Sequence, residues 1–256
     1  MTKSIVRVGL VASFIGFGLA CGGGTTDGDI STTPAPAGDQ AAAPAGDGAA
    51  APAATGSADF KNWSDKDVEQ RLKAAGWTVE ECYSSREDGE EYNDCDAVKG
   101  NLAAAVELTK YTNEEDARWT VEDEPAAVRD GKVALEVTVY DGDSAAKVLD
   151  QVAPKGTKIN AIESSKVEAA LKGLGFKIEE SSRSREDGMI YEEVYGTKGA
   201  GYAVVDWSYK EGGKGGQEIR ITESGSAVVT QGYEDVVSIV ILDADKAKAL
   251  LNDIRK

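Results

Sequence analysis

The chain has 256 residues, of which 45 are Asp or Glu, 28 are Lys or Arg and none is His, giving a formal net charge of −17. Such an acidic surface repels nucleic acid phosphates and anionic lipid headgroups, so nucleic acid is disfavoured as a partner and a membrane is expected to be reached only through an anchor. The absence of histidine removes the commonest general base and metal ligand, together with Ser-His and Cys-His nucleophile arrangements. We therefore expect no catalytic residue, no bound metal and no cofactor.

Residues 1–20 have the pattern of a signal peptide, because Lys3 and Arg7 precede an apolar run that is too short for a membrane span of about 20 residues. The run ends at Gly-Leu-Ala-Cys, with the cysteine at position 21. This ending resembles the lipobox of bacterial lipoproteins, although the leucine stands two positions before Cys21 rather than three. The resemblance implies a lipid such as palmitate on Cys21, and Gly22 in place of Asp implies the outer membrane, facing the periplasm or the surface. The alternative is an ordinary secretory leader with a chance cysteine.

Residues 21–59 are composed almost wholly of Gly, Ala, Pro, Thr, Ser and Asp. A segment of this composition has too few apolar side chains to form a core. We expect it to be a disordered tether between the lipid anchor and the folded part of the chain.

A 14-residue stretch occurs twice in the folded part. Residues 76–89 and 175–188 are 99 positions apart and are identical at 8 of 14 positions. Similar patterns of helix and strand surround both copies, so the sequence predicts an α+β fold made by tandem duplication, with lobe 1 at 60–155 and lobe 2 at 160–256. Each lobe is expected to contain a helix, four or five antiparallel strands and a second helix.

In lobe 1 the first helix is expected to begin with a capping box at Ser64 and to end at Gly76. Alternating apolar residues then predict strands, a short one of which covers 119–121. The second helix is expected to be N-capped by Asp143, and its counterpart in lobe 2 by Asp245. Because the segment between the lobes is short, we expect the lobes to pack together about an approximate two-fold axis.

Two cysteines flank the first predicted hairpin turn, at residues 88–89. Cross-strand partners about this turn have residue numbers that add to 177, as do those of Cys82 and Cys95. The pair falls on a non-hydrogen-bonded site, where side chains lie close enough for a disulfide, and an exported location permits one. Two free thiols, or half of a metal site, are the alternatives. Alternation from Trp77 and Val79 places Cys82 on the face away from the core.

The sequence Ser-Arg-Glu-Asp-Gly occurs intact at both predicted hairpin tips, 85–89 and 184–188. The Asp-Gly turn is explained by its tolerance of positive φ, but a turn does not require the preceding Arg and Glu. A structural role and a binding role therefore both remain open. The candidate binding residues are Arg86, Glu87, Asp88, Arg185, Glu186 and Asp187.

Together these features predict a membrane-anchored envelope lipoprotein that acts as a non-catalytic binding or scaffolding module for a protein partner. Two alternatives are an acidic inhibitor or decoy of a cationic protein and a carboxylate-dependent glycan hydrolase. An enzyme is not expected, because the usual signatures of a catalytic site are missing from the sequence. The binding site is expected in the groove between the lobes or at the hairpin tips.

Overall fold

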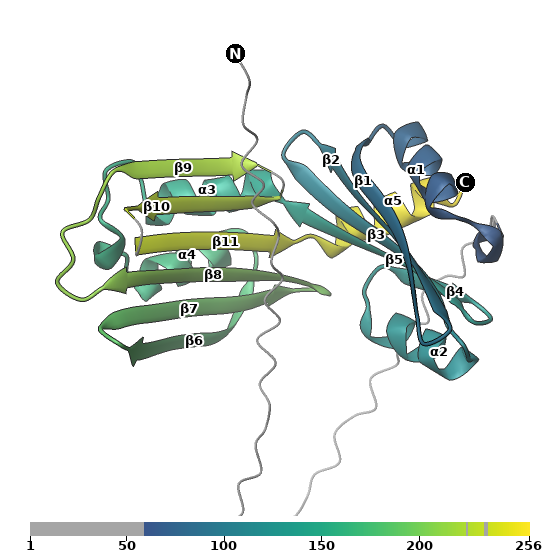
Figure 1. The fold of residues 1–256 in the computed structure, drawn as a ribbon. Helices are drawn as coiled ribbons and strands as arrows, with labels where there is room; N and C mark the ends of the chain where they lie inside the picture. Colours follow the sequence, from purple (N-terminus) through teal and green to yellow (C-terminus); the bar gives the residue numbers. More distant parts are fainter. Residues whose placement is uncertain (1–58, 224, 233–234) are drawn as a thin grey trace, which may run out of the picture. The chain divides into compact units, whose positions relative to one another are not determined.

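The computed structural model describes residues 59–223, 225–232 and 235–256. The predicted signal peptide, the lipidation site at Cys21 and the predicted tether lie outside the described residues. The described residues all belong to one compact unit. Their strands form one 11-stranded sheet in which neighbouring strands are antiparallel (Figure 1).

The predicted fold class, a tandem pair of α+β lobes each closed by its own helices, is wrong. The sheet runs without a break in the order β1-β2-β3-β5-β11-β8-β7-β6, with β4 paired to β5, β10 to β11 and β9 to β10. We call the strands before residue 142 the first half of the sheet and the later strands the second half. The first half contains β1 (Thr78–Glu87), β2 (Glu90–Lys99), β3 (Leu102–Lys110), β4 (Ala127–Asp130) and β5 (Val133–Asp141). The second half contains β6 (Lys177–Glu186), β7 (Met189–Lys198), β8 (Gly201–Lys210), β9 (Glu218–Glu223), β10 (Ser226–Gln231) and β11 (Asp235–Leu242).

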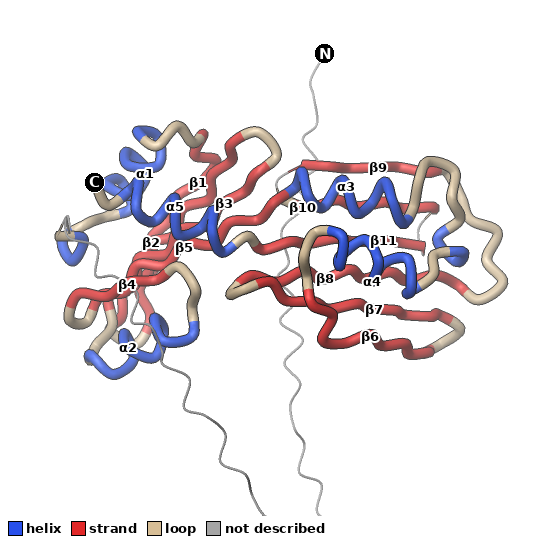
Figure 2. The backbone as a smooth tube through the Cα atoms, turned by 180° about the vertical axis from the view of Figure 1, so that it is seen from behind, coloured by secondary structure: helices blue, strands red, loops and turns tan. Residues whose placement is uncertain are grey.

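The helices that follow β5 and β11 are exchanged between the halves, which is the second departure from the predicted fold. Helix α3 (Gly142–Val152) packs against β10, β11 and α4 (Ser164–Gly173) of the second half. Helix α5 (Ala244–Ile254) packs against β5 and α1 (Asp65–Ala74) of the first half. Figure 1 shows α5 beside α1, and Figure 2 shows α3 beside α4. The last strand of each half therefore leads into a helix that covers the other half.

The exchange follows from how β5 and β11 meet at the centre of the sheet. They pair only at their C-terminal ends, where Leu242 lies opposite Tyr140 and the Asp243 amide donates to the Val139 carbonyl at 2.8 Å. Because the two strands run in opposite directions, each points into the other half as it ends. Helix α3 begins directly after β5, and α5 begins one residue after β11, so no loop is available to turn either helix back.

The N-caps of these two helices lie together at the crossing point. They are Asp141 and Asp243, each two residues before the predicted cap, and both accept hydrogen bonds from amides of the first helical turn. Lys246 bridges them, with its Nζ 2.7 Å from Asp141 Oδ2 and 2.5 Å from Asp243 Oδ2. This ion pair joins the two crossing helices.

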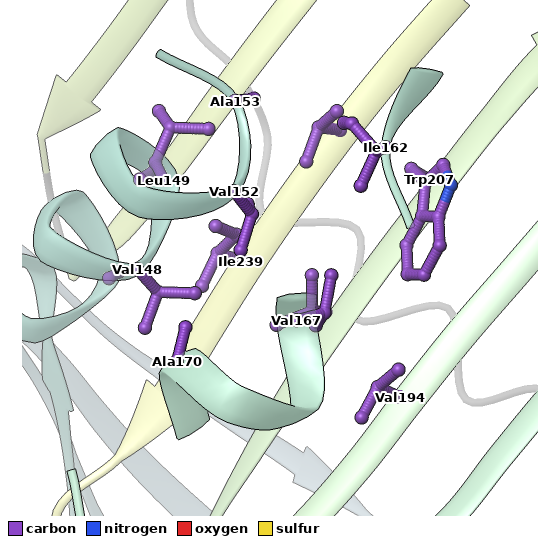
Figure 3. Packing of buried hydrophobic residues seen from close by; sticks show 14 of the residues in the cluster. Val148, Leu149, Val152, Ala153, Ile162, Val167, Ala170, Val194, Trp207 and Ile239 are labelled. Carbon is purple, nitrogen blue, oxygen red and sulfur yellow. The ribbon is translucent and has the colours of Figure 1, made fainter. Parts of the chain in front are cut away.

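Two apolar cores lie under the helices, one in each half. In the second half, Val148 and Leu149 of α3 share one cluster with Val167 of α4 and Ile239 of β11, as Figure 3 shows. In the first half, the core side chains from α5 are the predicted apolar stripe of that helix. They are Ala247, Leu250, Leu251 and Ile254, and none is more than 5% exposed. The stripes are thus buried as predicted, but under the other half's sheet.

A disulfide joins Cys82 to Cys95, which confirms the predicted register of the first hairpin. The prediction that it lies outside the core is wrong, because Cys95 is 1% exposed and belongs to the first-half core. The reason is a β-bulge between Val79 and Glu81, which adds one residue to β1 and returns Cys82 to the helix-covered face. The second hairpin has a bulge at the matching place, between Ile178 and Glu180.

The segment around Trp119 is a helix and not the predicted short strand. Helix α2 (Glu114–Asp123) begins at Asn113, whose side chain accepts hydrogen bonds from the amides of Glu115 and Asp116. Three acidic residues in its first turn suit the positive end of the helix dipole. This helix packs on β4 and β5, and the second half has the strand β9 in the corresponding stretch of sequence.

Candidate functional site

One face of the sheet is covered by α1, α3, α4 and α5, and the opposite face is largely open. Along β5, β8 and β11, buried residues under the helices alternate regularly with half-buried residues on the opposite face. We call the half-buried side the open face. In the first half, α2 covers one end of it, where Thr109 and Ala134 are buried.

Three carboxylates stand side by side on the open face of the first half. Asp94 of β2 pairs with Glu107 of β3, and Glu107 pairs with Glu136 of β5. Neighbouring strands are about 4.8 Å apart, and like charges directly opposite each other destabilise a sheet. We call these residues the first carboxylate row.

The first carboxylate row is held in an environment that favours protonation. Burial, followed by the charges of Glu107, Glu124 and Asp94, raises the pKa of Glu136 to about 8. Loss of hydration and neighbouring carboxylates also raise the pKa of Glu107, and burial raises that of Asp94 despite a hydrogen bond from Tyr83. Part of this row therefore carries protons near neutral pH.

The second half repeats the arrangement at positions 99 residues later. Glu193 of β7 pairs with Asp206 of β8, and these correspond to Asp94 and Glu107. Burial, then a hydrogen bond with Glu193 and the charge of Glu193, raises the pKa of Asp206 to about 7. We call Glu193 and Asp206 the second carboxylate row.

Neither row is neutralised by a basic side chain in the part of the chain that the structure describes. The ion pairs found there include none of the five row residues. Elsewhere the chain does pair buried or half-buried acids, as it does for Asp141 with Lys246. The row residues thus lack a basic partner of the kind that Asp141 has.

Tyrosines lie on the open face beside both rows. Tyr83 is aligned with Asp94 and donates a hydrogen bond to it, which is the main reason that the pKa of Tyr83 rises to about 12. Tyr195 and Tyr202 have ring centroids 6.2 Å apart, and Tyr140 lies near Tyr202 at the centre of the sheet. The open face thus combines carboxyl groups with aromatic rings and hydroxyls.

The structure gives the hairpin tips a mainly structural role. Asp88 and Asp187 have φ values of 51° and 49°, and each is followed by a glycine of positive φ, as a two-residue turn of this kind requires. Arg86 binds Glu91 at 2.6 Å, and Arg185 binds Glu211. The arginines therefore fix each hairpin to its own surroundings.

The remaining tip residues, Glu87 and Glu186, are exposed and have no side-chain partner among the residues that the structure describes. The tips belong to hairpins at opposite ends of the main strand order, which begins with β1 and ends with β6. The structure therefore does not bring the two predicted tips together into one site.

Two hollows lie on other parts of the surface. One, of about 380 Å³, is lined by polar side chains between α1 and the first hairpin and includes Arg86 and Glu91. The other, of about 530 Å³, lies at the helix crossing and includes Lys246 with both of its aspartate partners. The charged groups just named already pair with each other, and neither hollow is lined by a residue of the carboxylate rows.

Sequence reasoning missed the carboxylate rows. An acidic residue at an outward strand position normally indicates only contact with solvent. The available signal was the 99-residue spacing, which relates Asp94 to Glu193 and Glu107 to Asp206.

No family model and no curated protein matches the chain. Within the described ranges, no group of three or more His, Cys, Asp or Glu side chains is placed to hold a metal ion. No described helix is long and apolar enough to cross a membrane.

Proposed function

We propose that this protein is a membrane-anchored envelope lipoprotein whose folded part is a non-catalytic binding or scaffolding module for a protein partner. The observation that carries this proposal is the open face of the sheet, where two rows of carboxyl groups lie in register without basic partners in the described chain. A sheet face of this kind is complementary to a protein surface rich in Lys and Arg. The partner is therefore a cationic protein, and the anchor holds the module at the membrane where it meets that partner.

The alternative of an acidic inhibitor or decoy uses the same surface and differs only in whether docking blocks the partner's activity. The alternative of a glycan hydrolase has less support. Such enzymes hold a sugar in a cleft between two carboxyl groups, whereas the row residues lie on the open face and line neither of the two hollows described above.

The docking proposal is tested with a fluorescent oligolysine peptide as the cationic probe. The variant Asp94→Asn, Glu107→Gln, Glu136→Gln neutralises the first carboxylate row, and because it removes repulsion it is expected to fold. We expect its affinity for the probe to fall by about tenfold or more relative to the unmodified full chain. The matched control, Glu87→Gln, Glu186→Gln, Asp245→Asn, also replaces three acidic residues by amides, at exposed positions outside the rows. Equal affinities of the two variants would exclude the open face as the docking surface.

The anchor is tested separately by replacing Cys21 with Ser. We expect this change to abolish metabolic palmitate labelling and to release the protein from the membrane fraction. Unchanged palmitate labelling of the variant would refute the lipidation site and leave the docking proposal unaffected.

A further inference from the structure

The carboxylate rows suggest a way in which docking responds to pH. Glu193 and Asp206 are aligned across β7 and β8, and both are half-buried. Two negative charges this close together in a partly buried position repel each other, so one proton held by the pair is favoured.

The surroundings of the pair supply no other charge that would remove the proton. On the open face, Asp206 lies opposite Ser238 of β11, and Glu193 lies opposite Ser182 of β6. The nearest titratable side chains on the neighbouring strands are those of Tyr191 and Tyr195 on β7 and Glu180 on β6, which lies opposite Tyr195. Neither Glu193 nor Asp206 lies opposite a basic side chain.

The first half has a counterpart in Glu107 and Glu136, which are aligned across β3 and β5. The charged groups facing Glu136 from neighbouring elements are Asp94, Glu124 and the diagonally placed Arg129 of β4. Arg129 is exposed and donates its hydrogen bond to the Gly131 carbonyl, so acidic groups dominate around Glu136.

We propose that each half of the open face holds one proton near neutral pH, on the Glu193–Asp206 pair and on the Glu107–Glu136 pair, and that a cationic partner displaces these protons when it docks. The displacement rests on the proposed docking function, whereas the protonation is a property of the free protein. When an ammonium or guanidinium group approaches a pair, the carboxyl O–H bond breaks, the proton passes to buffer, and the ionised pair binds the cation. Docking is therefore weaker at low pH, where releasing the proton is unfavourable.

The protonation is tested by carboxyl-carbon NMR titration of the unmodified full chain, with Asp206→Asn and Glu136→Gln used to assign the signals. We expect one carboxyl group of the second row to titrate near pH 7. In Glu193→Gln its midpoint should fall by about one pH unit or more, because the neighbouring charge is removed. In Glu186→Gln, a control at the exposed second hairpin tip, the midpoint should not move. Titration of every row residue below about pH 5, the range of ordinary carboxyl groups, would overturn the proposal.

The coupling is tested by calorimetric titration of the full chain with oligolysine in two buffers of different ionisation enthalpy at neutral pH. A difference in observed enthalpy that corresponds to release of about one proton per pair supports the proposal. Binding without proton release would overturn the coupling and leave the proposed function standing. If oligolysine does not bind, the proposed function and the coupling both fail, and the NMR titration alone decides the protonation.

Discussion

The first half of the sheet contains a disulfide and the helix α2, and the described residues of the second half contain neither. Where the first-half core has Cys95, the position 99 residues later is Val194, which is fully buried. Where α2 covers one end of the first half's open face, the second half instead adds the strand β9. Yet both halves keep carboxyl groups in register on that face. The carboxylate rows are therefore independent of the features in which the halves differ.

The largest effect is expected from breaking the helix exchange. Leu250 of α5 and Leu149 of α3 are 3% and 1% exposed, and replacing either by Ala should lower the free energy of unfolding by about 2 to 4 kcal/mol. Leu250→Ala should accelerate amide hydrogen exchange in β3 and β5, and Leu149→Ala should do so in β10 and β11. Lys248→Ala, at an exposed position of α5, is the control. The packing of each helix on the other half would be contradicted if Leu250→Ala accelerated amide hydrogen exchange in β10 and β11 instead, and Leu149→Ala in β3 and β5.

Removing the disulfide should affect the first half alone. Cys82 and Cys95 are 13 positions apart in the sequence, and the variant Cys82→Ala, Cys95→Ala opens the loop between them. We expect the free energy of unfolding to fall by only about 2 kcal/mol, because the hairpin already restricts that loop. Hydrogen exchange should accelerate in β1 and remain unchanged in β6, its counterpart at the other edge. Equal acceleration in both edge strands would show that the disulfide acts on the whole sheet.

A smaller effect, of opposite sign, is expected at the second carboxylate row. The pKa of Asp206 is about 7 in the folded protein, so the folded state binds a proton that the unfolded state has already released between about pH 4 and 7. The folded protein consequently loses stability as pH rises through this range. Asp206→Asn removes this pH-dependent loss. The free energy of unfolding of the variant, relative to that of the unmodified chain, should therefore be about 1 to 2 kcal/mol higher at pH 8 than at pH 4, a figure reduced because Asp206 is partly exposed. Denaturant unfolding at both pH values checks this, and a pH-independent difference would exclude a raised pKa.

The smallest effect is expected at the first hairpin. Lys110 and Arg86 hydrogen bond to Glu91 and lower its pKa to about 2, so this carboxylate stabilises the folded state above about pH 4.5 and loses that effect as pH falls towards 2. Because surface ion pairs contribute little, Glu91→Gln should lower the free energy of unfolding by at most about 1 kcal/mol at neutral pH. At pH 2 the substitution should leave the free energy of unfolding unchanged. The second half has Ile190 at the matching position, and Arg185 there pairs with Glu211 instead. A cost that persists at pH 2 would assign the effect to packing.

The parts of the fold that the sequence predicted depend on contacts between nearby residues. The turn at Asp88 and Gly89 sets the register of its hairpin, and that register places Cys82 opposite Cys95. The face of the disulfide was not predictable from alternation alone, because one bulged residue inverts every later side chain of the strand. The bulge coincides with two adjacent glutamates in both hairpins, at 80–81 and 179–180, which is the only local sign of it that we recognise.

The helix exchange was not predictable for a different reason. An apolar stripe such as that of Leu250 and Leu251 shows which side of a helix is buried, but it does not show which sheet buries it. That choice depends on the meeting of β5 and β11 at the single pair Leu242 and Tyr140, a contact between residues about 100 positions apart. The candidate site was missed because alignment across several strands is a property of the whole sheet.

The exchange of helices also sets the order in which the protein can be completed as it is made. Ribosomes deliver a chain from its N-terminus, and domains usually fold in that order. Here the second half receives α3 before its own strands are made, whereas the first half waits for α5, which follows all eleven strands in the sequence. Until α5 has been made, the apolar side chains of β5 lack the helix that packs on them in the complete fold. The half of the sheet that is made first is therefore completed last, and a chain that stops before α5 leaves that half incomplete.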